Sequence, residues 1–206
     1  MLNRRQLLTA SAAGAAALAL PASFASAQNY PSVEEVLFDA EIPVLGNPKG
    51  DVTIIEYFDY QCPYCKRGHP ELMKVVKKDG NVRLVMKDWP IFGASSVHAA
   101  SMVLAQAGGD YEKAMDALMA TPARLTNKQI DAALKGAGFV LAAMQAAFKK
   151  DQKRIDGILA RNMDQATAFG FGGTPSFIVG TKLFHGVMEE KALTAAIAET
   201  RAGRAS

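Results

Sequence analysis

Hydrophobic and polar positions in the middle of the chain alternate between short strand-like runs and longer helix-like runs. Residues 52–58 are β-branched or aromatic apart from one glutamate, which is typical of a buried strand. A helix-compatible run follows from Pro63 to about Lys78, and residues 82–86 have the pattern of a second strand. A strand, a helix and a strand in this order predict two parallel strands joined by a right-handed crossover.

Between about residues 94 and 168 the pattern becomes helical and rich in alanine. Glycines and Thr121-Pro122 interrupt it, which leaves four expected helices at 96–107, 110–120, 127–136 and 141–168. Thr126 and Gln129 have the spacing of a capping box at the start of the third helix. We therefore expect an α/β fold that carries an inserted α-helical subdomain.

The two ends of the folded region also show boundary signals. Ser32 and Glu35 have the spacing of another capping box, which opens a short helix, and a short edge strand is expected near residues 42–45. Residues 176–179 and 182–185 have the pattern of two strands, and the two-residue gap between them predicts an antiparallel hairpin. An amphipathic helix over 189–201 is expected to close the chain.

The only two cysteines, Cys62 and Cys65, stand where the first strand meets the helix that follows it. Cys62 is placed to be the N-cap of this helix, and Pro63 is placed to be its first residue. A thiol at a helix N-terminus faces unpaired backbone N–H groups and the positive end of the helix dipole, which stabilise its thiolate. The position of the pair therefore indicates a reactive dithiol.

A structural disulfide and a zinc site are the alternative uses of this pair. A bridge within so short a loop removes little entropy from the unfolded chain, so it would add little stability. Structural zinc needs four ligands, and only His69, His98 and His185 are available to join the two thiols. We therefore expect redox chemistry that needs neither a metal nor a dissociable cofactor.

Residues 1–27 have the features of an export signal. Arg4-Arg5 precede a run rich in alanine and leucine, and Ala25-Ser26-Ala27 is an A-x-A cleavage site. The apolar run is shorter than the roughly 20 residues of a membrane span, which disfavours an anchor. The twin arginines are compatible with a Sec-type or a Tat-type signal. We expect export to a bacterial periplasm, with residues 28–206 as one domain.

The charge of the exported portion gives no indication of nucleic-acid binding. The whole chain has a formal net charge of +3, and the expected signal contains two arginines and no acid, which leaves +1 for the remainder. A nearly neutral chain without runs of basic residues is not typical of proteins that bind nucleic acids or anionic membranes.

Two motifs resemble those of the DsbA-like thiol–disulfide oxidoreductases, which belong to the thioredoxin superfamily. The first is Phe58-Asp59-Tyr60-Gln61-Cys62-Pro63-Tyr64-Cys65, with Pro70 five residues after its last cysteine, and the second is Gly173-Thr174-Pro175-Ser176-Phe177. The resemblance covers nearly all of residues 28–206, because a helical insertion between the two motifs is itself a DsbA-type feature. It implies a thioredoxin fold.

The resemblance also implies roles for the motif residues. Cys62 would be the nucleophilic and more exposed cysteine, and Cys65 would resolve the mixed disulfide. Pro175 would be a cis proline against the sulfurs, and Thr174 would present its backbone to an extended substrate. Pro63 and Tyr64 would help to set the stability of the thiolate. The alternatives are a trans Pro175 that opens an edge strand and a Tyr64 that is only a surface aromatic.

Glu56 lies six residues before Cys62 in the first strand, where the superfamily places a buried acid. A lone buried carboxyl has a raised pKa and is able to relay a proton to Cys65. Lys87 resembles the lysine that accompanies this acid in the family. The alternatives are a glutamate that faces water at a sheet edge and a lysine exposed at a strand end.

The resulting functional prediction is a monomeric periplasmic dithiol oxidase. It would donate its disulfide to unfolded or partly folded exported proteins, and a membrane partner linked to quinones would reoxidise it, as the resemblance implies. Two alternatives remain at this stage. One is an isomerase or reductase of the same fold, and the other is a client-binding chaperone with a static disulfide.

Overall fold

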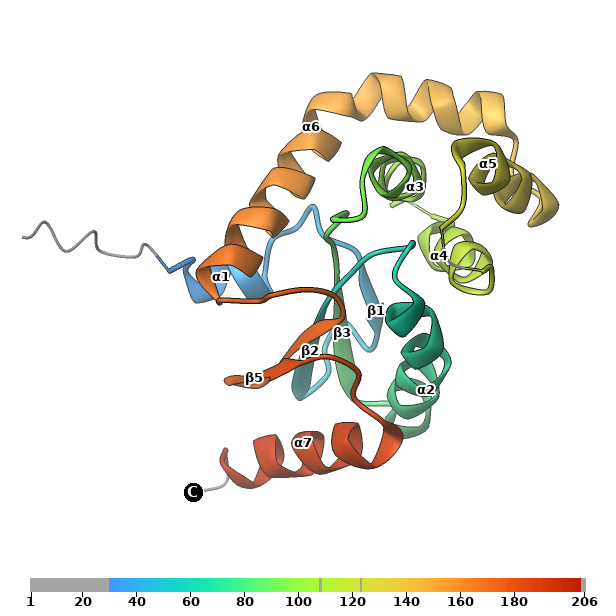
Figure 1. The fold of residues 1–206 in the computed structure, drawn as a ribbon. Helices are drawn as coiled ribbons and strands as arrows, with labels where there is room; N and C mark the ends of the chain where they lie inside the picture. The colour runs from blue at the N-terminus through green and yellow to red at the C-terminus, as the bar shows by residue number, and fades with distance from the viewer. Residues whose placement is uncertain (1–29, 108, 123, 205–206) are drawn as a thin grey trace, which may run out of the picture.

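The computed structural model describes residues 30–107, 109–122 and 124–204, and Figure 1 shows their arrangement. The expected export signal, residues 1–27, lies outside the described residues. A sheet with the strand order β1-β3-β2-β4-β5 forms the centre. Its strands are β1 (Val44–Gly46), β2 (Val52–Phe58), β3 (Val82–Asp88), β4 (Ser176–Val179) and β5 (Lys182–His185).

The strand pairing confirms the main topological predictions. β2 and β3 are parallel, whereas the other neighbouring pairs are antiparallel, including the β4–β5 hairpin. The edge strand β1 begins two residues later than expected. Pro43 has no N–H to donate to a strand ladder, although its carbonyl accepts a hydrogen bond of 3.0 Å from Met86 N.

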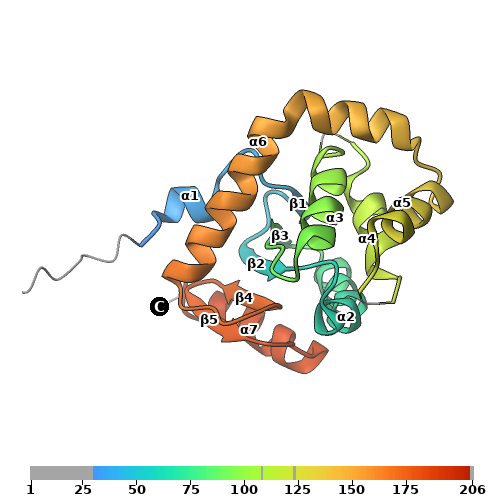
Figure 2. The same ribbon diagram turned by 45° about the horizontal axis from the view of Figure 1, so that its top comes forward.

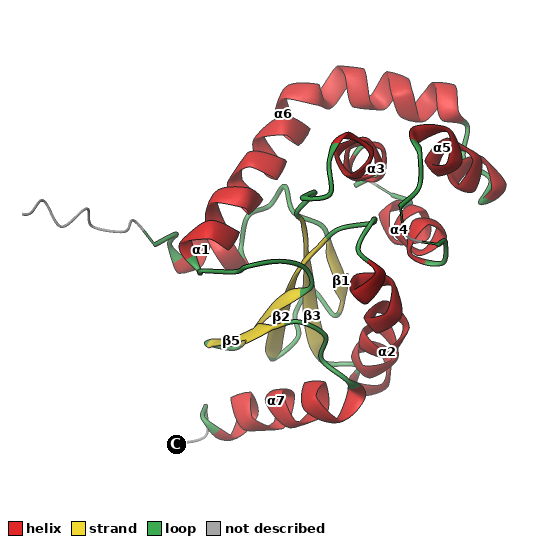
Figure 3. Cartoon of the chain, in the orientation of Figure 1, coloured by secondary structure: helices red, strands yellow, loops and turns green. Residues whose placement is uncertain are grey.

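Helices cover both faces of the sheet, as the cartoon coloured by secondary structure shows (Figure 3). α2 (Pro63–Asp79) and α7 (Glu190–Ala202) pack together on one face. α1 (Val33–Leu37) and the C-terminal part of α6 (Leu141–Ala168) lie on the other face, where Gln165 accepts a hydrogen bond of 3.0 Å from the Tyr57 hydroxyl of β2.

The helical block consists of α3 (Ala94–Leu104), α4 (Tyr111–Met119), α5 (Asn127–Gly136) and α6, and it lies between β3 and β4 in the chain. In Figure 2, α3, α4 and α5 lie together beside the end of β2 that leads into α2, and α6 runs from this group to the sheet. α3 ends three residues earlier than predicted, because Gln106 N and Ala107 N bond to the carbonyls three residues before them and close a tight turn.

Both expected capping boxes are present at helix N-termini. Ser32 and Glu35 cap α1 reciprocally, and Thr126 and Gln129 cap α5 in the same way.

No single helix in the described ranges is long and apolar enough to cross a membrane. α5 and α6 meet that criterion only as a pair, and the pair bends by 117°.

Alternation along β2 decides which side chains face the dithiol. Successive residues of a strand point to opposite faces, and Tyr57 points to the face covered by α6. Glu56 and Phe58 therefore point to the opposite face, where α2 carries the cysteines.

Candidate active site

Cys62 is the N-cap residue of α2, as the sequence predicted, and Pro63 is the first residue of the helix. The Cys62 sulfur accepts a hydrogen bond of 3.5 Å from the Cys65 backbone N–H. Both cysteines are free thiols in this structure. The helix N-terminus therefore supplies the backbone donor that the sequence led us to expect beside a thiolate.

The second motif meets the first although the two are more than 100 residues apart. The Thr174–Pro175 peptide bond is cis, which confirms the expected conformation of Pro175. The Cys62 thiol donates a hydrogen bond of 3.2 Å to the Thr174 carbonyl. Ser176 stabilises this turn by donating from its hydroxyl to the Gly173 carbonyl at 2.7 Å.

The two thiols have opposite electrostatic environments. A hydrogen bond from the Cys65 thiol has the largest influence on the pKa of Cys62. Together with the Thr174 side chain and the backbone N–H groups of Cys65 and Tyr64, it lowers this pKa to about 6 despite burial. Burial raises the pKa of Cys65 well above its ordinary value, and the neighbouring Cys62 and Glu56 add to that shift. Cys62 is therefore the cysteine that ionises first.

The expectation that Cys62 is the more exposed cysteine is wrong for this conformation. The relative exposure of both Cys62 and Cys65 is 0%. The sulfur of Cys62 is covered because it lies against the Thr174–Pro175 turn, a contact that the local sequence around the motif does not contain.

Glu56 is buried in the sheet, with a relative exposure of 2%. It lies opposite Met86 on β3 and Phe177 on β4, so its neighbours in the sheet are apolar on both sides. Burial, together with the charge of Cys62, raises the pKa of Glu56 to about 8. The alternative of an acid facing water at a sheet edge is therefore excluded.

Lys87 is not the partner of Glu56, which corrects the expectation from the resemblance. Lys87 pairs with Tyr57, one residue out of register with Glu56, so it points to the face covered by α6. It is fully buried. Burial lowers the pKa of Lys87 to about 8, with Asp39 opposing that shift and Arg161 adding to it.

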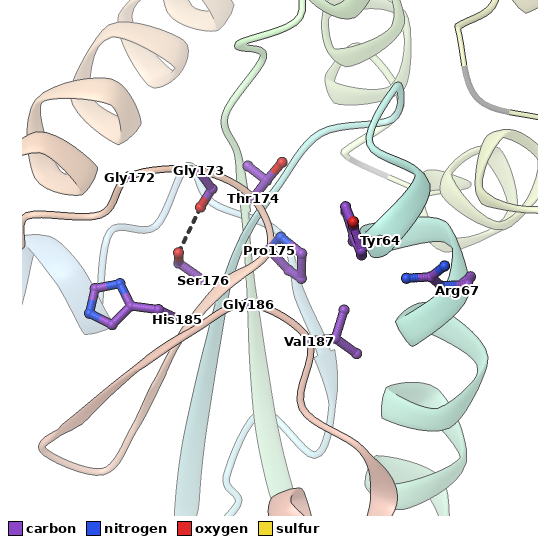
Figure 4. A pocket seen from close by; sticks show the side chains of 10 residues that line it. All are labelled: Tyr64, Arg67, Gly172, Gly173, Thr174, Pro175, Ser176, His185, Gly186 and Val187. Carbon is purple, nitrogen blue, oxygen red and sulfur yellow. Dashed lines mark hydrogen bonds between the residues drawn. The ribbon is translucent and has the colours of Figure 1, made fainter.

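A groove of about 490 Å³ lies beside the cis-proline turn (Figure 4). Tyr64 projects from α2 toward Pro175 and is 54% exposed. The Arg67 guanidinium lies 4.7 Å from the centre of the Tyr64 ring. The remaining lining residues are Gly172, Gly173, Thr174, Ser176, His185, Gly186 and Val187. Thr174 and Tyr64 therefore line one groove, whereas Pro63 is exposed at the helix start and is not part of the lining.

The contacts of the three histidines are with residues other than the two cysteines. His69 Nε2 is 2.8 Å from Asp116 Oδ1, and His98 Nε2 is 2.8 Å from Asp131 Oδ1. His185 packs edge-on against Phe171. Among the described residues, no three side chains of the kinds that bind metals come close enough to hold an ion.

Sequence reasoning missed a second buried acid on the sheet face that carries Glu56. Asp88 is 1% exposed, accepts a hydrogen bond of 3.0 Å from the Tyr111 hydroxyl, and lies on the same sheet face as Glu56. Burial raises the pKa of Asp88 to about 8. The sequence signal for this site was an acid at the end of a hydrophobic strand. Its partner Tyr111 comes from α4, so the local sequence around Asp88 does not predict the pair.

Comparison with known proteins identifies the family. The thioredoxin family model matches residues 39–199. The chain belongs to the thioredoxin family. This match spans both motifs and the helical block, so the expected thioredoxin fold with an inserted helical subdomain is confirmed.

Solved structures of thioredoxin-family proteins resemble the chain over most of its length. A thioredoxin-like oxidoreductase from Silicibacter pomeroyi is 36% identical, with a TM-score of 0.79, over 84% of this chain and 99% of that one. A periplasmic thioredoxin-like protein from Salmonella enterica serovar Typhimurium is 27% identical, with a TM-score of 0.73, over 82% and 95%. The thiol-disulfide exchange protein alpha-DsbA2 from Wolbachia pipientis is 25% identical, with a TM-score of 0.74, over 81% and 90%. The resemblance to DsbA-like proteins is thus confirmed.

Two curated relatives are much longer than this chain, and both are named as Na(+)/H(+) antiporters. The chain is 28% identical over 191 residues to the Na(+)/H(+) antiporter NhaA 1 of Salinispora arenicola, a match that covers 83% of this chain and 28% of that protein. A match to the antiporter NhaA 3 of Salinispora tropica covers 24% of its length. The chain therefore spans less than a third of these relatives.

Proposed function

We propose that the protein is a periplasmic thiol–disulfide oxidoreductase that introduces disulfides into exported proteins through Cys62 and Cys65. The observation that carries the proposal is the asymmetry of the two thiols: the pKa of Cys62 is lowered to about 6 and that of Cys65 is raised. A thiol that is ionised at neutral pH is both a competent nucleophile and a good leaving group.

The exchange proceeds in two steps that balance in sulfur and electrons. A substrate thiolate attacks the Cys62 sulfur of the oxidised protein, which forms a mixed disulfide and releases Cys65 as a thiolate. A second substrate thiolate then attacks the substrate sulfur of the mixed disulfide and releases Cys62 as a thiolate. The substrate leaves with a new disulfide, and the protein has gained two electrons.

Glu56 is the proposed proton carrier for Cys65. The buried Cys65 thiolate that forms in the first step is disfavoured, because burial raises the pKa of this thiol. Glu56 holds a proton at neutral pH, since its pKa is raised to about 8, and its charge is close enough to influence Cys65. Proton transfer from Glu56 to Cys65 therefore removes the unfavourable buried thiolate.

The groove beside Pro175 is the proposed substrate site. An extended substrate segment would pair with the backbone of Thr174, whose carbonyl reaches Cys62, and would lie against Tyr64. Pro63 begins the helix that stabilises the thiolate, and Tyr64 forms one wall of the groove. The Cys62 sulfur is covered in this conformation, so exchange requires it to become accessible beside the Thr174 turn.

Stabilisation of the Cys62 thiolate shifts the exchange toward the oxidase direction by a modest amount. At pH 7 a thiol with a pKa of about 6 rather than 9.0 stabilises the reduced protein by about 1.4 kcal/mol, which raises the reduction potential by about 30 mV. Thiolate pKa values are about 7 in thioredoxin and about 3.5 in DsbA. The pKa of Cys62 lies nearer to the thioredoxin value, so a reductase or isomerase of the same fold is the second candidate.

Export, domain extent and recycling complete the proposal. Residues 1–27 would direct the chain to the periplasm by a Sec-type or Tat-type route, and residues 28–206 would form a monomeric domain. The periplasmic relative from Salmonella supports this location. Unfolded or partly folded exported proteins would be the substrates, and a quinone-linked membrane protein would reoxidise the dithiol.

The reduction potential of the Cys62–Cys65 pair tests the direction of electron flow. Equilibration with glutathione buffers should give a reduction potential of about −120 mV for an oxidase, whereas about −270 mV would identify a reductase. Restoration of disulfide formation in a host that lacks its oxidase tests the catalytic role. If a Cys62→Ala variant restored it as well as the wild type, the protein would be a client-binding chaperone rather than a redox enzyme.

A further inference from the structure

The residue that precedes the cysteine motif is bound to the helical block. Gln61 is 2% exposed, and its side chain makes a two-point contact with one residue of the block. Its Oε1 accepts a hydrogen bond of 2.6 Å from Leu125 N, and its Nε2 donates to the Leu125 carbonyl at 2.8 Å. Nε2 also lies 3.0 Å from Ser95 Oγ, near the start of α3. Gln61 thus ties the start of the motif to the helical block.

The residue that follows the motif is bound to the same part of the block. The Lys66 ammonium donates hydrogen bonds to Leu118 O at 3.0 Å, Thr121 O at 3.0 Å, Thr121 Oγ1 at 2.8 Å and Pro122 O at 3.1 Å. These acceptors lie at the C-terminus of α4, where free carbonyls carry partial negative charge and attract a cation. We use the name clamp loop for the four residues that make the contacts to Gln61 and Lys66, namely Leu118, Thr121, Pro122 and Leu125.

Asp59 fixes the turn that leads into the motif. Its Oδ1 accepts a hydrogen bond of 2.7 Å from Gln61 N, and its Oδ2 accepts bonds of 2.7 Å from Ile91 N and 3.1 Å from Phe92 N. The turn is therefore attached to the segment after β3, whereas the side chains on both sides of the cysteines are attached to the clamp loop.

We propose that Gln61 and Lys66 are positioning residues that hold both ends of the Cys62–Cys65 segment on the clamp loop, so that the helical block sets the stability of the Cys62 thiolate. This inference rests on the proposed redox function. The hydrogen bond from Cys65 N to the Cys62 sulfur is 3.5 Å long. A small displacement of either end of the segment would lengthen this bond and weaken it.

The direction of the effect follows from charge and geometry. The Lys66 charge interacts with Asp59 and Cys65, which opposes the burial that lowers the pKa of Lys66 to about 8. Loss of the Lys66 or the Gln61 contact frees one end of the Cys62–Cys65 segment, which weakens the hydrogen bond from Cys65 N and makes the Cys62 thiolate less stable. The pKa of Cys62 should therefore rise, and the reduced form should become less favoured relative to the disulfide.

The test measures the equilibrium in which the protein disulfide and two glutathione molecules give the dithiol and one glutathione disulfide. A hydrogen bond contributes about 0.5–1.5 kcal/mol net, so we expect Gln61→Ala and Lys66→Met each to lower this equilibrium constant by about 2-fold to 12-fold. The midpoint pH for alkylation of Cys62 should rise in both variants. Lys66→Arg, which retains the cation, should recover part of the effect.

Matched controls separate positioning from general destabilisation. Gln165→Ala removes a buried glutamine that bonds to Tyr57 on the other sheet face, and Lys74→Met removes an α2 lysine that pairs with Glu190. Both should leave the equilibrium constant within twofold of the wild type, even where urea unfolding shows lower stability.

A variant in the clamp loop distinguishes the proposal from a purely local effect and does not alter α2. Thr121→Val removes one acceptor of Lys66 and leaves the cysteine segment intact, and it should shift the equilibrium in the same direction. The proposal is overturned if the folded Gln61, Lys66 and Thr121 variants all keep the wild-type equilibrium constant within twofold. Exchange by the wild type under the same conditions shows that the proposed redox function survives that outcome.

Discussion

Replacing Glu56 with glutamine tests whether this buried carboxyl is protonated in the folded protein. Burial and the charge of Cys62 raise its pKa from 4.5 to about 8. Because the folded state binds the proton more tightly than the unfolded state, ionisation of Glu56 opposes folding. The penalty is absent below pH 4.5 and grows as the pH rises toward 8. Glutamine does not titrate, so it removes this pH dependence.

The magnitude follows from the two pKa values. Each unit of difference between the folded and unfolded pKa corresponds to about 1.36 kcal/mol, so the penalty at pH 8 exceeds that at pH 5 by about 3.5 kcal/mol. The free energy of unfolding of Glu56→Gln relative to the wild type should increase by this amount between the two pH values. Any packing or hydrogen-bonding cost of the glutamine amide is the same at both pH values, so it cancels from this difference.

Urea unfolding of the reduced proteins at pH 5, 6, 7 and 8, in a phosphine reductant, measures this difference. Glu34→Gln is the control, because Glu34 is an exposed glutamate on α1. A stability difference between Glu56→Gln and the wild type that stays the same at pH 5 and pH 8 would show that burial does not hold the proton on Glu56. The proton-carrier role would then fail with it.

Three further predictions concern the thiols and Lys87. The pKa of Cys62 is lowered to about 6, so the midpoint pH for its alkylation should lie near that value. The slope of the reduction potential against pH should change at the same pH from about 60 to about 30 mV per unit. A midpoint near the ordinary value of 9.0 would show that the hydrogen bonds to Cys62 do not lower its pKa. Thr174→Val removes a hydroxyl that lowers the pKa of Cys62, so the midpoint should move upward, and no movement would exclude that contribution. Burial lowers the pKa of Lys87 to about 8, which penalises folding at neutral pH, so Lys87→Met should raise the free energy of unfolding at pH 7. The same variant should leave the alkylation midpoint of Cys62 unchanged, since Lys87 faces away from the thiols.

Local sequence signals predicted the elements that carry the site. The Ser32 and Thr126 capping boxes and the N-cap position of Cys62 depend on residues within three or four positions of one another, and all are present in the structure. The identity of Pro175 as a cis proline came from the resemblance rather than from local chemistry, and the structure confirms that geometry.

Features that depend on how separate segments meet were not predictable in the same way. The faces of Glu56 and Lys87 depend on the register of two parallel strands, and a difference of one residue reverses the outcome. The covering of Cys62 depends on the Thr174 turn. The contacts of Gln61 and Lys66 depend on where the helical block docks, although both residues are adjacent to the motif and were visible in the sequence.

The charges on Cys62 and Glu56 are coupled, and this coupling gives the site a second pH dependence. Between about pH 6 and 8 the reduced site carries the Cys62 thiolate while Glu56 stays protonated, whereas the disulfide form has no thiolate to raise the pKa of Glu56. The pKa of Glu56 is therefore lower in the oxidised protein. In the interval between its two values, reduction takes up one additional proton, so the potential should fall more steeply with pH, by up to about 60 mV per unit. Glu56→Gln should abolish this steeper interval near pH 8 and keep the change of slope near pH 6. A steeper interval that persists in the variant would assign it to another group.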